Sequence, residues 1–359
     1  MARILYSCCG EGQGHSSRVL TITRALTSLG HQVKVLASHK AFKVLNPRLP
    51  DVREIPGFTF VYRNNRVELV ASFWGNLPLL RQRGRVIREI TDLIEEWQPD
   101  LAITDFEPFL PRAACVTGLR CISLDHQGVI PFARPSLPLD QRIPALAARS
   151  VVGLTDYYVE ARLATSFFYP PVPAGKNVHF YPPILREKVR EITPRADGHV
   201  VVYQTSSSFT RLPELLKQLP FKFKVFAYEN ATESEDGNVS YYPRSDARFI
   251  EEVGTAAWVL TNGGYTLMSE ALYLGKPVFS LPVAWQFEQW LNARYLQDLG
   301  YGVMCDDLRD FPVKMTEFIG QLGMYRENIL RQDFCGNEAA LAHILKFLPA
   351  NEPVVARLL

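Results

Sequence analysis

The sequence lacks several features that would assign a function at once. It has no run of about 18 apolar residues, so we expect no membrane-spanning helix. Its 39 basic and 37 acidic side chains nearly cancel, and a net charge of +2 argues against nucleic acid as the main partner. No two cysteines form a CxxC pair, and no Cys/His cluster has the spacing of zinc ligands. We therefore predict no metal site, and reduced cysteines in a cytoplasmic protein.

The chain is long enough for two domains. Its 359 residues compare with about 100–200 residues for an average domain. A hydrophobic content of 47% and a charged content of 21% are ordinary for a soluble globular protein. The apolar run from Ile4 to Cys9 ends at Gly10, so it is too short for a signal peptide and instead predicts the first strand.

Strand and helix patterns alternate along the chain and then restart. In the first part we predict strands at residues 3–8, 32–37, 101–104 and 120–124, with helices at 16–29 and 85–97. In the second part we predict strands at 199–204, 223–227, 256–260 and 277–281, with helices at 212–219, 266–274 and 287–299. This alternation predicts an α/β fold with two Rossmann-like domains, each built on a parallel sheet.

Proline-rich composition marks the boundary between the two parts. Pro182, Pro183 and Pro194 flank a charged stretch that reads as a linker. We predict an N-terminal domain at residues 1–180, a linker at 181–198 and a C-terminal domain at 199–335. A final helix near 338–347 lies in the segment 336–359, which we expect by fold analogy to return to the first domain.

A glycine-rich loop, Gly10-Glu11-Gly12-Gln13-Gly14-His15, joins the first strand to the first helix. Such a loop permits positive φ angles and close backbone approach, and the following helix N-terminus attracts negative charge. A dinucleotide fingerprint is the alternative. However, the third glycine comes one residue early, and no acid for a ribose follows the second strand. We therefore disfavour a nicotinamide or flavin cofactor.

His15 and Asp105 are candidate catalytic residues. A histidine titrates near neutral pH and can remove a proton from a hydroxyl. Asp105 ends a predicted strand at the carboxyl edge of the sheet, where it could bond the far imidazole nitrogen and fix the tautomer. The alternatives are a histidine bonded to the helix backbone, a turn aspartate before Pro108, and a metal pair with Glu107. No other hard-cation ligands stand nearby, and the sequence has no Asp-x-Asp.

A longer set of residues resembles a known family. Residues 263–272 (GGYTLMSEAL), followed by Gly275-Lys276-Pro277, Glu288-Gln289 and Asn292-Ala293, resemble the donor-site signature of GT-B glycosyltransferases. The superfamily includes the UDP-glycosyltransferases and the peptidoglycan N-acetylglucosaminyl transferase. Residues 10–18, 103–106 and 124–127 resemble an uncharacterised prokaryotic group within it. The resemblance extends over nearly the whole chain.

The resemblance implies a GT-B fold with the site between two domains. It implies inversion at the anomeric carbon without a metal, using a nucleotide sugar as substrate and no cofactor. His15 takes the position of the general base, and Asp105 that of its carboxylate partner. The expected donor-binding residues are Gly14, Ser206, Ser207, Arg244, Asn262, Gly263, Gly264, Tyr265, Thr266, Glu270, Glu288 and Gln289.

Roles for these donor residues also follow from the resemblance. The glycine pair and Thr266 would hold the diphosphate at a helix start, and Glu270 would hold the ribose hydroxyls. Glu288 and Gln289 would read the sugar. Asn262 departs from relatives that carry histidine there, so the diphosphate would rely on backbone groups or on Arg244. Each of these residues could instead be an ordinary turn or surface residue.

The predicted function is hexosyl transfer from a nucleotide sugar, with UDP expected and dTDP or GDP as alternatives. An epimerase of related fold and a non-catalytic nucleotide-binding module remain open, as does a binding-only role for His15. The acceptor is a small-molecule or lipid-linked hydroxyl compound. Residues 63–88 carry six arginines among aromatic and leucine side chains. That pattern is typical either of contact with an anionic membrane surface or of a solvated helix face.

Overall fold

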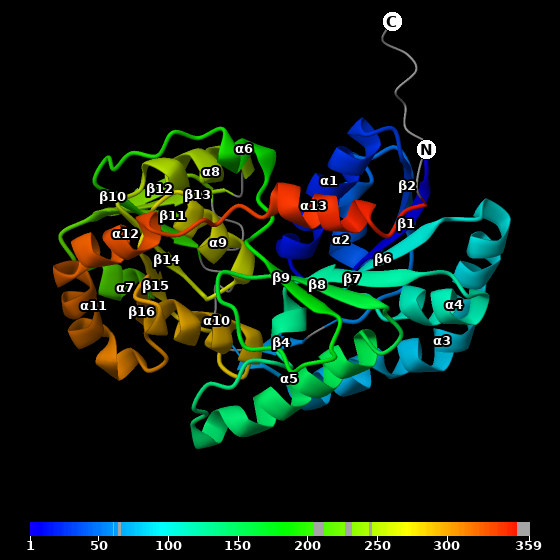
Figure 1. Ribbon diagram of the computed structural model, residues 1–359. Coiled ribbons are helices and arrows are strands. Elements are labelled where there is room, and N and C mark those ends of the chain that lie inside the picture. The colour runs from blue at the N-terminus through cyan, green and yellow to red at the C-terminus, as the bar shows by residue number, and fades with distance from the viewer. Residues whose placement is uncertain (60, 64–65, 204–211, 227–231, 244–245, 350–359) are drawn as a thin grey trace, which may run out of the picture.

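The computed structural model describes residues 1–349, apart from 60, 64–65, 204–211, 227–231 and 244–245 (Figure 1). Within these residues the chain forms two seven-stranded sheets, one in each half, and a two-stranded ribbon of β4 (Tyr62–Arg63) and β5 (Arg66–Val67). In the same part of the chain, no helix is long and apolar enough to cross a membrane. The fold is α/β with two Rossmann-like domains, as the sequence predicted.

The first sheet is parallel throughout, in the order β3-β2-β1-β6-β7-β8-β9. Its central strands are apolar on both faces because helices cover both sides of the sheet. Its strands are β1 (Arg3–Cys8), β2 (Gln32–Ala37), β3 (Val52–Glu54), β6 (Leu101–Asp105), β7 (Cys121–Asp125), β8 (Ala161–Thr165) and β9 (Val178–Tyr181).

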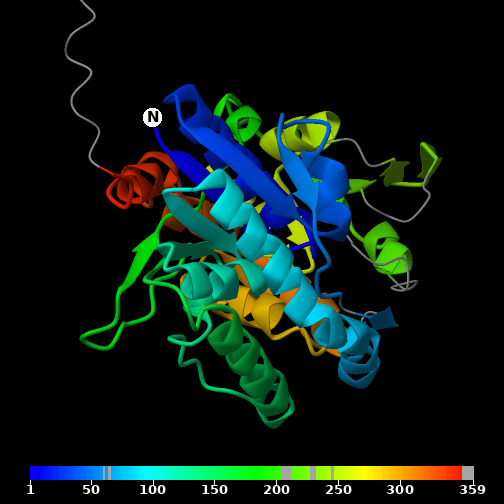
Figure 2. The same cartoon turned by 90° about the vertical axis from the view of Figure 1, so that its right-hand side faces the viewer.

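Alternate residues of β1 point to two different cores. Ile4 and Tyr6 pack with α1 (Gln13–Ser28), whereas Leu5 packs with α3 (Leu69–Trp97) and α4 (Phe109–Thr117). The remaining helices of this half are α2 (His39–Leu45) and α5 (Arg142–Thr155). Figure 2 shows α3 and α4 together on one side of the first sheet.

The second sheet has the order β12-β13-β11-β10-β14-β15-β16 and is parallel except for the pair β12–β13. Its strands are β10 (His199–Tyr203), β11 (Lys222–Phe226), β12 (Ser234–Asp236), β13 (Val239–Tyr242), β14 (Trp258–Thr261), β15 (Val278–Ser280) and β16 (Gly302–Met304). Its helices are α7 (Leu212–Lys217), α8 (Asp246–Thr255), α9 (Tyr265–Tyr273), α10 (Phe287–Asp298), α11 (Phe311–Gly320) and α12 (Leu322–Leu330).

The chain crosses between the halves twice. After β9 it passes through α6 (Glu187–Arg190) to the second sheet, where the Asp197 backbone N–H bonds the Thr255 carbonyl at 2.9 Å. At its end, α13 (Asn337–Leu345) lies against α1, and Ile344 and Phe347 join the core of the first half (Figure 1).

One predicted helix is much longer than expected. The sequence predicted residues 85–97, but α3 runs from Leu69 to Trp97 and includes Pro78. Gly75, Pro78 and Gly84 read locally as helix breakers. Burial of Leu79 and Val86 in the core beneath the helix outweighs those local preferences.

Candidate active site

The candidate residues lie where the carboxyl ends of the two sheets face each other. The loop after β1 leads to His15 on α1, and β6 ends at Asp105. In the second half, β14 leads through Asn262 and Gly263 into α9. Parallel strands bring their ends to one edge, so residues distant in sequence converge here.

Gly14 lies close to the second half at the start of α9. A Cβ at this position would overlap Thr266 Oγ1 in the first turn of α9. Only glycine allows this approach, so the first glycine loop lies directly beside the helix start that we expect to bind the diphosphate.

We expect Gly14→Ala to lower the free energy of unfolding by about 1–3 kcal/mol, because the added methyl group overpacks the junction. Chemical denaturation would measure the change. Thr266→Ala in the same chain should recover most of the loss, since it removes the overlapping hydroxyl. Gly153→Ala on α5, where nothing stands within 4 Å of the new Cβ, is the matched control. Equal stability of Gly14→Ala and wild type would contradict the contact.

Asp105 holds His15 in place with the help of Arg18. His15 Nδ1 lies 2.6 Å from Asp105 Oδ1. Arg18 donates from Nε to Oδ2 and from Nη2 to Oδ1, each at 2.7 Å. The Asp105 side chain is fully buried and the Arg18 side chain is 4% exposed. Sequence reasoning gave Arg18 no role, although it stands three residues after His15 and therefore on the same helix face.

The partners of Asp105 determine its ionisation. Burial alone would raise the pKa of Asp105, but the Arg18 guanidinium and His15 outweigh it and hold the pKa below its ordinary value. An ionised carboxylate only accepts hydrogen bonds, so His15 Nδ1 must carry the proton. In a neutral imidazole, His15 Nε2 is then left as the acceptor.

Phe106 supports the same histidine from a strained position. Its backbone adopts φ 54°, in the left-handed region that residues other than glycine seldom enter. Its ring stacks on the His15 imidazole with centroids 6.0 Å apart. Strain of this kind persists where surrounding structure enforces it, and it is frequent at active sites.

Two side chains after β7 reach across to α10. Gln127 donates from Nε2 to Glu288 Oε2 at 2.9 Å and lies 3.5 Å from His15 Nε2. Its Oε1 is buried and has no hydrogen-bond partner among the residues that the structure describes. His126 Nε2 lies 2.8 Å from Asn292 Oδ1. The sequence resemblance pointed to Glu288. The contacts that Gln127 and His126 make with α10 could not be predicted from the sequence, because they depend on how the two halves pack together.

The side chains of Tyr265 and Gln289 contact other groups of the protein. The Tyr265 ring stacks on His126 with centroids 3.7 Å apart and is 6% exposed. Gln289 Oε1 accepts from the Val283 backbone N–H at 2.9 Å. The Tyr265 ring therefore takes part in the packing between the halves, whereas Gln289 holds a loop within the second half.

The turn before α9 depends on Gly263. It adopts φ 92°, and a Cβ would stand 2.8 Å from the Gln289 carbonyl oxygen. Asn262 is buried and donates to the Leu281 carbonyl at 3.4 Å. Gly264 forms the N-cap of α9, where no side chain caps the helix. The first N–H groups of α9 therefore lack intrahelical partners and suit an anion.

Glu270 has a partner that the sequence did not reveal. Arg186, at the start of α6, donates from Nε to Oε1 and from Nη2 to Oε2, each at 2.6 Å. The Glu270 side chain is 4% exposed. A carboxylate has about four lone-pair directions, so two can still accept hydroxyl groups. Ser206, Ser207 and Arg244 lie outside the described residues.

Glu107 does not form a metal pair with Asp105. Its carboxylate accepts from the backbone N–H groups of Phe109 and Leu110 at 2.8 and 2.9 Å, and so caps α4. Burial raises the pKa of Glu107 to about 7. Within the described ranges, no group of three or more His, Cys, Asp or Glu could hold a metal ion.

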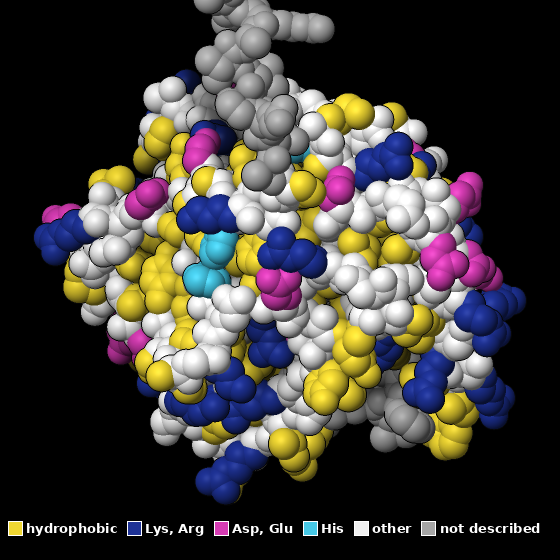
Figure 3. All heavy atoms as spheres, turned by 45° about the vertical axis from the view of Figure 1, so that its right-hand side comes forward, with side chains coloured by type: hydrophobic (Ala, Val, Ile, Leu, Met, Phe, Trp, Pro, Cys, Tyr) yellow, Lys and Arg dark blue, Asp and Glu magenta, His cyan; other side chains and the backbone are white. Residues whose placement is uncertain are grey.

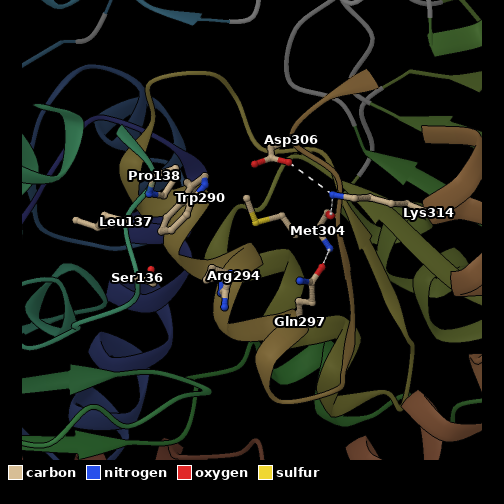
Figure 4. Close-up of a pocket in the computed structure, with 9 residues that line it drawn as sticks. All are labelled: Ser136, Leu137, Pro138, Trp290, Arg294, Gln297, Met304, Asp306 and Lys314. Carbon is tan, nitrogen blue, oxygen red and sulfur yellow. Dashed lines mark hydrogen bonds and ion pairs between the residues drawn. The ribbon is translucent and has the colours of Figure 1, made fainter. Parts of the chain in front are cut away.

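A separate pocket of about 340 Å³ lies on another face of α10 (Figure 4). It is lined by Ser136, Leu137, Pro138, Trp290, Arg294, Gln297, Met304, Asp306 and Lys314. Lys314 donates to the Met304 carbonyl at 2.9 Å and pairs with Asp306 at 3.6 Å. Lys314 and Asp306 are therefore paired within the protein, and none of the candidate catalytic residues lines the pocket.

Comparison with known proteins decides the family. Residues 2–322 match the family model described as glycosyl transferase family 1. The chain belongs to glycosyl transferase family 1. An uncharacterized glycosyltransferase of Methanosarcina acetivorans is 27% identical over 323 residues, 84% of this chain and 82% of that protein.

Solved structures show the same fold. The calicheamicin glycosyltransferase CalG4 is 17% identical over 97% of this chain and 98% of its own, with a TM-score of 0.66. The glycosyltransferase SsfS6 of Streptomyces sp. SF2575, complexed with thymidine diphosphate, is 18% identical over 96% and 100%, with a TM-score of 0.59. The protein is thus a GT-B glycosyltransferase that uses a nucleotide-sugar donor.

Proposed function

We propose that this glycosyltransferase moves a hexose from a pyrimidine nucleotide sugar to an acceptor hydroxyl, with inversion and without a metal. The contact that carries the proposal is the bond between His15 Nδ1 and Asp105, which leaves Nε2, 3.5 Å from Gln127 Nε2, as a proton acceptor. The cytoplasm is the proposed compartment, and the acceptor is a small-molecule or lipid-linked hydroxyl compound.

The proposed reaction is a single displacement. His15 Nε2 takes the proton of the acceptor hydroxyl as its oxygen bonds the anomeric carbon. The bond from that carbon to the phosphate oxygen breaks, and its electron pair leaves with the nucleoside diphosphate. Asp105 stabilises the resulting imidazolium, while Arg18 keeps Asp105 ionised.

The leaving diphosphate is held by the second half. The uncapped N–H groups of α9, the Thr266 hydroxyl and Gly263 form its binding site. Glu270 binds the ribose hydroxyls, with Arg186 fixing its orientation. Uridine diphosphate follows from the sequence resemblance, and the thymidine diphosphate bound to SsfS6 supports a pyrimidine base.

Donor binding requires the halves to separate. Gly14 meets Thr266, and Gln127 bonds Glu288 across the same junction. Rings also stack across the junction, Tyr265 on His126 and Tyr295 on Phe168, so a hinge at the linker containing α6 would have to break these contacts as well. The unpartnered Gln127 Oε1 then becomes available to a substrate hydroxyl.

A screen of nucleotide sugars tests this function. We expect release of UDP or thymidine diphosphate from one donor when acceptors, including water, are supplied. Conversion of the donor to an epimer without acceptor would favour the epimerase instead. Binding of nucleoside diphosphates without turnover of any nucleotide sugar would favour a binding module, and no binding at all would refute the proposal.

A further inference from the structure

Helix α5 has a second apolar face, directed away from the protein. One face of the helix is buried through Pro144, Ala145, Val152 and Thr155. The other exposes Ile143 by 63%, Leu146 by 68% and Leu154 by 62%. Ile143 and Leu146 are one helical turn apart, and Leu154 lies about two turns further along the same face, beyond the exposed Ser150. Large apolar stripes on a water-facing helix mark interaction sites.

The stripe continues beyond both ends of the helix. Leu139, just before α5, is 77% exposed, and Tyr157, just after it, is 74% exposed. On α3, Trp74 is 63% exposed and Leu80 is 39% exposed, while Leu79 packs in the core. We call the exposed residues of α5, its two flanks and the N-terminal part of α3 the α5 surface.

Positive charge accompanies this apolar surface. Residues 69–88 contain four arginines and no acidic residue, and residues 139–157 contain two arginines, the exposed Asp140 and the buried Asp156. The arginines of α3 are exposed, as is the first arginine of α5; they are Arg81, Arg83, Arg85, Arg88 and Arg142. Arg85 pairs with Glu89, one turn further along the same helix, at 3.4 Å.

Both helices lie along the same side of the molecule. Figures 1 and 2 show α5 and the N-terminal part of α3 at its lower edge, away from the second sheet. In Figure 3 that lower edge carries basic and hydrophobic side chains, and the acidic ones lie higher. Apolar anchors among arginines suit an anionic bilayer, which accepts leucine and tyrosine side chains and attracts guanidinium groups.

We propose that the α5 surface docks on an anionic lipid bilayer. The charge pattern selects this partner, because a second copy of the chain would place the same arginines against each other. The sequence had pointed only to residues 63–88. In the structure most of the exposed apolar side chains lie on α5 and its flanks, for which the sequence had predicted no role. Helix α3 contributes most of the arginines.

Helix α5, which carries most of this surface, contacts α10 of the second half, and the first turn of α10 carries Glu288. If the proposed transfer holds, an acceptor held in the bilayer would reach the junction from this side. Docking itself rests on the folded surface alone, so it can be tested without any donor.

Vesicle binding tests the proposal. The full chain is mixed with phosphatidylcholine vesicles, with and without phosphatidylglycerol, and the bound fraction is measured by sedimentation. We expect binding to the anionic vesicles that weakens with salt and is much weaker on neutral ones. The double variant Ile143→Glu, Leu146→Glu should bind at least about tenfold more weakly, because two anchors become charged.

Leu330→Glu on α12 is the matched control, since Leu330 is 70% exposed in the other half. It should bind vesicles like the wild type, and circular dichroism should show all variants folded. Absent binding to anionic vesicles, or equal binding by the double variant, would overturn the proposal. So would a dimer of the wild type that Ile143→Glu dissolves, because the stripe would then face a second copy.

Discussion

We expect His15→Ala to lower kcat/KM for sugar transfer by about 10²–10⁴-fold, the usual contribution of a positioned general base. The physical reason is that His15 Nε2 is the proton acceptor of the proposed displacement, and the Gln127 amide 3.5 Å away has no basic nitrogen to replace it. Release of nucleoside diphosphate from the donor found by the screen provides the measurement. Donor affinity should stay within about threefold, because His15 acts on the acceptor proton.

This variant separates catalysis from binding. If His15 served only to hold phosphate, the donor dissociation constant would rise with the loss of rate. His179→Ala is the control, since His179 is exposed on β9 at the edge of the first sheet. A rate for His15→Ala equal to that of the control would remove His15 from the mechanism.

We expect Arg18→Met to lower the free energy of unfolding by about 3–5 kcal/mol, the cost of breaking a buried ion pair. Arg18 is 4% exposed and makes both hydrogen bonds to Asp105 through its guanidinium, so its loss leaves a buried carboxylate with His15 alone. Chemical denaturation measures the change. Arg24→Met, on the exposed side of α1, should alter stability by no more than about 0.5 kcal/mol.

The deficit should depend on pH. In the wild type the pKa of Asp105 is lowered, so its contribution to stability is present above the ordinary carboxyl pKa and is lost as the pH falls through the lowered value. Without Arg18, only His15 opposes the effect of burial, so the pKa of Asp105 rises from its wild-type value. The difference between variant and wild type should therefore be largest near neutral pH and shrink below about pH 4. A deficit that is the same at all pH values would mean that charge pairing is not its cause.

Much of the architecture follows from local sequence signals. Glycine and proline separate short apolar runs, so β1 and β2 were predicted with their observed bounds. The pairing of His15 with Asp105 could also be anticipated, because the ends of neighbouring parallel strands converge. In α3, by contrast, packing of Leu79 and Val86 overrides Pro78, which local rules treat as a break.

The contacts of the site that the sequence did not reveal depend on how the two halves pack against each other. Arg186 reaches Glu270 from α6, and Gln127 reaches Glu288 from the loop after β7. Each pair is separated by many residues and joined only by the packing of one half on the other. Gly14 illustrates both cases: its place in a tight loop was evident, but its contact with Thr266 was not.

The stereochemistry of transfer tests the central claim most directly. Proton NMR recorded before mutarotation, on the donor and acceptor pair that the screen finds (water included), gives the anomeric configuration of the product. A single displacement assisted by His15 predicts the configuration opposite to that of the donor. Retention of configuration, or a sugar epimerised at another carbon, would contradict the mechanism.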